Sequence, residues 1–85
     1  MSNRRRDGDE FTEDGIEGRY ANYFEIGHNA FEFVLDFGQK YSDGLKEKIH
    51  TRIITSPSYA KELFRVLEKS LAQYEKTFGL IEREE

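Results

Sequence analysis

The chain has 85 residues, which leaves room for one small domain and not for a second. Hydrophobic residues make up 36% of it and charged residues 35%, so its core must be thin, and a thin core is often completed by a partner. Cysteine is absent, which excludes disulfides, zinc–thiolate sites and cysteine nucleophiles and fits a cytoplasmic protein.

Neither a transmembrane segment nor a signal peptide is expected. No apolar run approaches the ~20 residues that a bilayer requires. The N-terminus, Met1 to Arg6, is followed by acidic residues, where a signal peptide would have an apolar stretch. We therefore expect a soluble, cytoplasmic protein that does not enter a membrane.

The net charge of −4 is concentrated at the ends of the chain. Residues 1–18 carry six acids against three Arg and too little apolar surface to offset the entropy of ordering, so we expect a disordered tail there. Residues 82–85 form a second charged tail. The single domain is expected over residues 19–81. Its part 19–79 carries nine Lys or Arg against eight acids, which makes no electrostatic case for nucleic acid.

Alternating residues predict two strands joined by a tight turn. The first strand is expected from about Arg19 to Ile26, and Gly27-His28-Asn29 supplies residues that tolerate positive φ at the reversal. The second strand is expected from about Phe31 to Gly38. Four large apolar side chains on one face mark it as core-facing: Phe31, Phe33, Leu35 and Phe37.

A polar loop over residues 38–47 leads to a third strand, expected at about Lys48–Thr55. Ser56-Pro57 is a helix start, since serine caps the first amides and proline loses no hydrogen bond at the first position. The helix is expected to run to Phe78, and Gly79-Leu80 fits a left-handed helix end with an apolar contact. The fold class is therefore α+β, with a three-stranded antiparallel sheet followed by one long C-terminal helix (β-β-β-α).

The apolar residues of this helix follow the spacing of an amphipathic helix that covers a sheet. At 1.5 Å per residue the helix would be about 33 Å long, whereas strands of seven residues span about 23 Å. The helix should therefore extend beyond the sheet and leave apolar surface in water unless another chain, or Leu80-Ile81 of the same chain, covers it. This predicts a homodimer whose interface contains Leu67, Leu71, Tyr74 and Phe78.

No convincing catalytic or metal-binding arrangement is visible in the sequence, so we expect neither an enzyme nor a bound cofactor. His28 and His50 lack the spacing of metal ligands. Asp36 on the second strand and His50 and Arg52 on the third form a candidate polar surface if the two strands pair in the right register. That surface is either a binding or acid–base site, or the solvent side of a sheet with one covered face.

Two further modes of binding stay open. The glycines form no Walker or dinucleotide-binding motif, but an aromatic sheet face can stack nucleic acid bases, with Tyr20, Tyr23 and Phe24 beside Lys48 and Arg52. A three-stranded sheet also has edges to which a partner strand can add.

Several separate segments resemble a known family: Tyr20-Ala-Asn-Tyr, Glu32-Phe-Val-Leu-Asp-Phe, Thr51-Arg-Ile-Ile-Thr-Ser-Pro and Tyr74-Glu-Lys-Thr-Phe-Gly. The chain is similar, over roughly residues 18–81, to the small bacterial and archaeal proteins catalogued as domain of unknown function 3467. The resemblance implies no established activity. Because some relatives are encoded near genes for RNA polymerase subunits, it implies a link with transcription.

The sequence thus favours a small non-catalytic module that acts as a homodimer and binds an unidentified protein. The alternative is a nucleic-acid-binding or transcription-associated factor.

Overall fold

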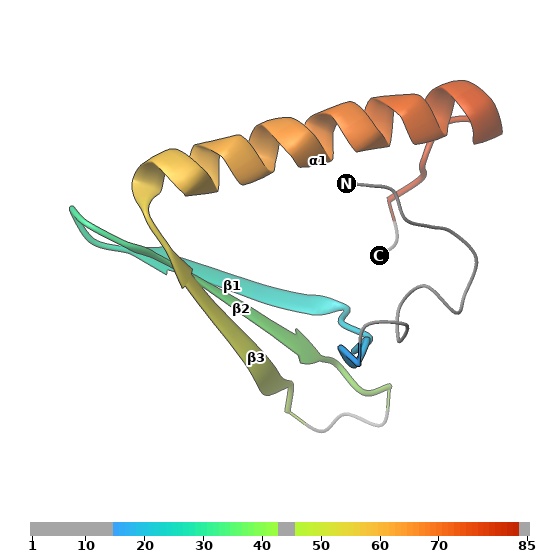
Figure 1. Cartoon of the computed structure of the whole chain (residues 1–85). Helices are drawn as coiled ribbons and strands as arrows, with labels where there is room; N and C mark the ends of the chain where they lie inside the picture. Colours follow the sequence, from blue (N-terminus) through green and yellow to red (C-terminus); the bar gives the residue numbers. More distant parts are fainter. Residues whose placement is uncertain (1–14, 43–45, 84–85) are drawn as a thin grey trace.

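The computed structural model describes residues 15–42 and 46–83, and it has the predicted β-β-β-α architecture (Figure 1). The sheet is antiparallel, with the strands in the order β1-β2-β3. Its elements are β1 (Tyr23–His28), β2 (Phe33–Gln39), β3 (Lys48–Thr55) and α1 (Pro57–Phe78). The bounds of β3 and α1 are those predicted. The expected tails fall mostly on residues 1–14 and 84–85, which lie outside the described residues.

The turn between β1 and β2 lies further along the chain than predicted. Gly27 and His28 belong to β1, Gly27 does not have a positive φ, and the reversal is made by residues 29–32. The Asn29 amide donates to the Glu32 carbonyl at 3.0 Å. The Asn29 side-chain oxygen accepts from the amides of Phe31 and Glu32 at 2.8 and 2.9 Å. The reversal is thus stabilised by hydrogen bonds to an asparagine side chain, where the sequence had predicted residues with positive φ.

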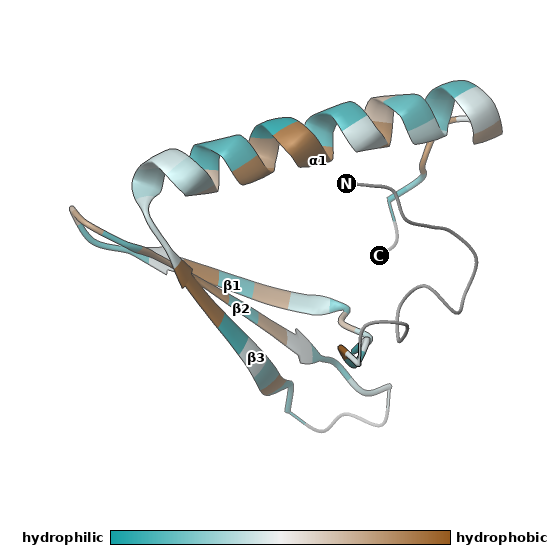
Figure 2. Ribbon diagram, viewed as in Figure 1, coloured by the Kyte–Doolittle hydropathy of each residue, from teal (hydrophilic) through white to brown (hydrophobic). Residues whose placement is uncertain are grey.

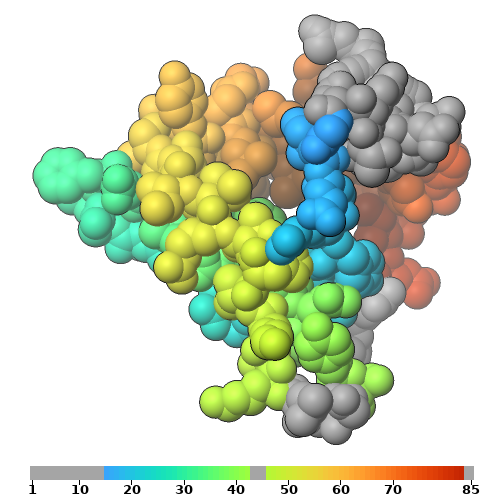
Figure 3. Space-filling view, turned by 60° about the horizontal axis from the view of Figure 1, so that its bottom comes forward, coloured from blue at the N-terminus to red at the C-terminus, as the bar shows by residue number. Residues whose placement is uncertain are grey.

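This shift moves Phe31 out of the sheet. The turn that contains it projects from the body of the molecule (Figure 3), and Phe31 is 80% exposed. The prediction that Phe31 faces the core is therefore wrong. The first strand is likewise shorter at its start than predicted, since residues 19–22 lie beside the sheet without belonging to β1.

The strand register divides the side chains between an apolar and a polar face of the sheet. We call the first the apolar face; its large apolar residues are Phe24, Ile26, Phe33, Leu35, Phe37 and Ile53, and their cross-strand partners His28, Thr51 and Thr55 share it. Leu35 lies at its centre, between its cross-strand partners Ile26 and Ile53, and is 7% exposed. We call the second the polar face; it consists of Tyr23, Glu25, Val34, Asp36, Arg52 and Ile54.

A β-bulge interrupts the pairing of β2 with β3. Phe37 pairs with Thr51, but the next residue, Gly38, pairs with Ile49, so that His50 is the extra residue. The backbones approach closely here, because a Cβ atom on Gly38 would lie 2.2 Å from the Lys48 carbonyl oxygen. Only glycine fits this position.

The ends of α1 follow from its sequence, with one difference. Ser56 caps the first turn, its hydroxyl accepting from the Tyr59 amide at 3.2 Å, and Pro57 is the first helical residue. Gly79 ends the helix at φ 100° and ψ 169°, which is not the left-handed helical conformation that we expected. The expected apolar contact of Leu80 is also absent, since Leu80 is 85% exposed.

The helix does not cover the sheet. It leaves the end of β3 and diverges from the strands (Figure 1), and none of its residues is buried. Figure 2 shows hydrophobic segments both along α1 and along the sheet. The expectation that the helix covers the sheet and only its far end extends beyond it is therefore wrong, because no helix residue is buried and only the start of α1, at Ala60 and Phe64, lies near the sheet. Among the described residues, no helix combines the length and the apolar character needed to cross a lipid bilayer.

Candidate interaction surfaces

Asp36 and Arg52 form an ion pair on the polar face. They are cross-strand partners, and the Arg52 guanidinium donates to both carboxylate oxygens, from Nε at 2.7 Å and from Nη2 at 2.8 Å. The Asp36 side chain is 9% exposed and that of Arg52 is 62% exposed, so the arginine covers the acid. Its hydrogen bonds and its charge lower the pKa of Asp36 against the opposing effect of burial. The pair uses two of the five N–H donors of the guanidinium and one acceptor site on each carboxylate oxygen.

Glu25 of β1 adds a third charged residue beside the Asp36–Arg52 pair. It lies directly opposite Asp36, where two acids would repel each other. The Tyr23 hydroxyl donates a hydrogen bond to the Glu25 carboxylate, and this bond raises the pKa of Tyr23 to about 12. Arg52 therefore stabilises the Asp36 carboxylate, and Tyr23 stabilises the neighbouring Glu25 carboxylate. Within the described segments, no three Asp, Glu or His side chains gather closely enough to hold a metal ion.

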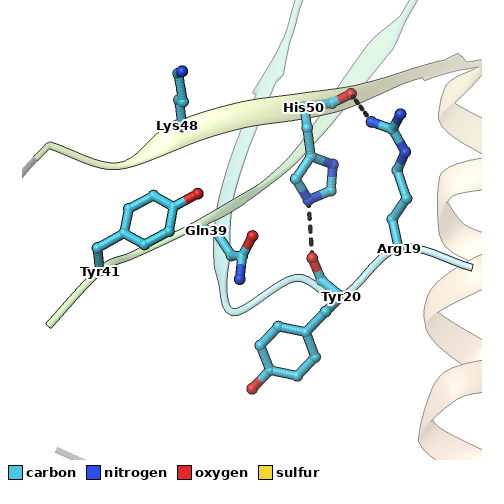
Figure 4. A pocket seen from close by; sticks show the side chains of 6 residues that line it. All are labelled: Arg19, Tyr20, Gln39, Tyr41, Lys48 and His50. Carbon is cyan, nitrogen blue, oxygen red and sulfur yellow. Dashed lines mark hydrogen bonds between the residues drawn. The ribbon is translucent and has the colours of Figure 1, made fainter.

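His50, the third residue of the predicted polar surface, is not paired with Asp36 or Arg52. Its Nε2 lies 2.9 Å from the Tyr20 carbonyl oxygen (Figure 4), which requires a proton on Nε2. Its Nδ1 lies 2.7 Å from the Thr51 hydroxyl. Arg19 donates to the His50 carbonyl at 3.1 Å. These bonds tie the segment before β1 to the bulge in β3, so both ring nitrogens of His50 are engaged in holding the fold.

His50 also contributes to a shallow pocket of about 290 Å³ at this end of the sheet. The pocket is lined by Arg19, Tyr20, Gln39, Tyr41, Lys48 and His50 (Figure 4). Tyr20 is 71% and Tyr41 44% exposed. The sequence pointed to Tyr20 and Lys48 but not to Gln39 or Tyr41. Gln39 is the last residue of β2 and Tyr41 follows it, and both reach the pocket only through the antiparallel pairing of the strands.

The four predicted interface residues all lie on one side of α1 and all are exposed. Leu67 is 53%, Leu71 44%, Tyr74 50% and Phe78 72% exposed, and the rings of Tyr74 and Phe78 are 4.9 Å apart. They continue the spacing that begins at Ala60 and Phe64. We call this row the helix stripe: Ala60, Phe64, Leu67, Leu71, Tyr74 and Phe78.

The helix stripe meets the apolar face only where the two elements join. A cleft of about 410 Å³ opens there, lined by Phe33 of the sheet and by Pro57, Ala60, Lys61 and Phe64 of the helix. Ala60 and Phe64 thus face the sheet of their own chain, whereas the described residues provide no cover for the stripe beyond them.

The family comparison matches this chain over residues 7–83 to a family described as "Protein of unknown function (DUF3467)". The chain belongs to that family, as the resemblance implied, and the match begins inside the segment that we expected to be a tail. No curated protein and no solved structure matches the chain.

Proposed function

We propose that this member of a family of unknown function is a non-catalytic assembly module that acts as a homodimer and binds another protein. One observation carries the proposal. Among the described residues, Leu35 is the only buried hydrophobic side chain, although α1 and the sheet both present rows of large apolar residues. Because small domains are marginally stable even when compact, this core is too small unless a second chain completes it.

The polar groups support a non-catalytic role. Asp36 is paired with Arg52, and both ring nitrogens of His50 have partners within the chain, which fits a structural role for these groups. In the homodimer the polar face and the outer strands β1 and β3 remain accessible, and these are where we place the protein partner. A chain without cysteine is suited to the reducing cytoplasm, where we place the protein.

The oligomeric state tests this proposal. Light scattering coupled to size-exclusion chromatography on the full chain, over a range of concentrations, should give twice the monomer mass of 10.0 kDa. Leu71→Glu should dissociate the dimer, because it places a charge in the helix stripe. Ala72→Glu is the matched control, since it adds the same charge to the next residue, outside the stripe, and should leave the dimer intact. A monomer at every concentration would contradict the proposal.

A second candidate function rests on the pocket at the end of the sheet. Two exposed tyrosines, Tyr20 and Tyr41, lie with Arg19 and Lys48, a combination that suits the stacked bases and phosphates of single-stranded nucleic acid. The test is fluorescence anisotropy with mixed-sequence DNA and RNA oligonucleotides at several salt concentrations. Binding that weakens steeply with salt and is lost in Tyr20→Ala would support it. Tyr59→Ala is the control, because Tyr59 lies on α1, outside the pocket, and is as exposed as Tyr20, at 70% against 71%.

A further inference from the structure

The separation of helix and sheet within one chain points to how two chains fit together. We propose that the C-terminal half of α1 in one copy packs on the apolar face of the sheet in a second copy, and reciprocally. This inference rests on the proposed homodimer and names its two contacting surfaces.

The connection between strand and helix explains why each chain leaves its own sheet open. Only Ser56 separates Thr55, the last residue of β3, from Pro57, the first of α1. Its backbone is extended, at φ −80° and ψ 162°, and its hydroxyl is bound to the Tyr59 amide. A one-residue connection with its side chain occupied as a cap has no slack, so the direction of α1 is set where it leaves the sheet.

The two open surfaces match each other in kind. A sheet with one apolar face and a helix with one apolar stripe form a stable layer when they pack together. Ala60 and Phe64 lie near Phe33 of their own chain, which leaves the part of the stripe from Leu67 to Phe78 without a sheet. That part is about 17 Å long, and strands of six to eight residues span about 20–26 Å, so it fits along the apolar face.

The area available is that of a stable dimer. On the sheet, Phe24, Ile26 and Ile53 are 57%, 60% and 47% exposed. The helix adds the four predicted interface residues, which are 44–72% exposed. With about 200 Å² for a large apolar residue, these seven side chains leave roughly 770 Å² per copy, or about 1,500 Å² per pair. Specific, stable interfaces bury about 1,200–2,000 Å² in total.

A second copy is the partner that satisfies both surfaces at once. Any other partner would have to supply an apolar helix for the sheet and an apolar sheet for the helix, whereas a second copy supplies both by symmetry. The charges of α1 do not oppose self-association. Four cations alternate with three anions along the helix: Lys61, Arg65, Lys69 and Lys76 with Glu62, Glu68 and Glu75.

Because the chain has no cysteine, introduced thiols report on the contact directly. Two full-length variants with different affinity tags, Ile26→Cys and Leu71→Cys, are denatured, mixed, refolded together and treated with a short bismaleimide. The expected product is a crosslinked heterodimer that carries both tags. Ile53→Cys with Leu71→Cys repeats the test on another strand, in case Ile26→Cys does not fold.

The matched control uses the opposite side of the same sheet. Ile54 lies on the polar face and is 57% exposed, close to the 60% of Ile26. Ile54→Cys with Leu71→Cys should give roughly tenfold less crosslinked heterodimer. The sheet would then lie between the thiol at residue 54 and the helix that carries the thiol at residue 71, and a short crosslinker cannot span it. The protein could be a dimer by light scattering while Ile26→Cys and Ile53→Cys crosslink to Leu71→Cys no better than this control does. That result would overturn the proposed packing of helix on sheet and leave the proposed homodimer standing. A monomer would overturn both.

Discussion

Gly38 offers a strong test of the local structure, because a single added methyl group meets the backbone of the next strand. In Gly38→Ala the Cβ would lie 2.2 Å from the Lys48 carbonyl oxygen and 2.9 Å from its carbon, so β3 must move by about 1.2 Å to regain the 3.4 Å of an ordinary contact. Forced overpacking costs about 1–3 kcal/mol, and a disrupted ladder hydrogen bond adds about 1 kcal/mol. We expect Gly38→Ala to lower the free energy of unfolding by about 2–4 kcal/mol.

Gly27 provides the matched control on the neighbouring strand. No atom lies within 4 Å of a Cβ built on it, and its φ is not positive. Gly27→Ala should therefore be neutral or stabilise the fold by about 0.4–1 kcal/mol, through the unfolded state. Both free energies are measured by urea unfolding followed by circular dichroism, at one fixed protein concentration because the proposed association would contribute to stability. Equal stability of the two variants would refute the close approach of β2 and β3 at the bulge.

Three further predictions concern side-chain hydrogen bonds. The lowered pKa of Asp36 means that its ion pair stabilises the fold above the ordinary aspartate pKa of about 4 and that this stability is lost as pH falls through the lower folded value. Arg52→Met should raise the Asp36 pKa, measured by NMR titration, and an unchanged value would contradict the pair. The raised pKa of Tyr23 means stability that is complete below about pH 10 and is lost as pH rises from there through 12, so thermal melts of Tyr23→Phe should lack this alkaline component. Asn29→Ala removes the acceptor for two turn amides and should cost about 1 kcal/mol in urea unfolding, whereas no loss would mean that the turn does not need it.

The sequence predicted those elements whose signals are local. Lys48–Thr55 alternates without interruption, and Ser56-Pro57 and Gly79 mark the ends of a helix with a consistent apolar spacing, so β3 and α1 have the predicted bounds. The possible pairing of Asp36 with Arg52 also followed from strand alternation once the register was assumed, and the structure has that register.

The features that the sequence missed depend on individual side chains or on close backbone contacts. Asn29 shapes the turn through its side-chain oxygen, whereas the sequence suggested Gly27 because glycine tolerates positive φ. The bulge at His50 breaks no alternation pattern, and its cause, the approach of Lys48 to Gly38, arises only when the strands pair. Tyr41 reaches the pocket with Tyr20 for the same reason.

The largest difference between prediction and structure lies in the partner assumed for the helix. Amphipathic spacing specifies that one side of α1 is buried in the functional protein, but it does not specify in which chain the covering surface lies. In the structure the extended backbone of Ser56 directs α1 away from the sheet that precedes it, so that sheet does not cover the helix. The apolar spacing that predicted a helix packed on its own sheet is therefore the basis of our proposal that, in a pair of chains, each helix completes the core of the other.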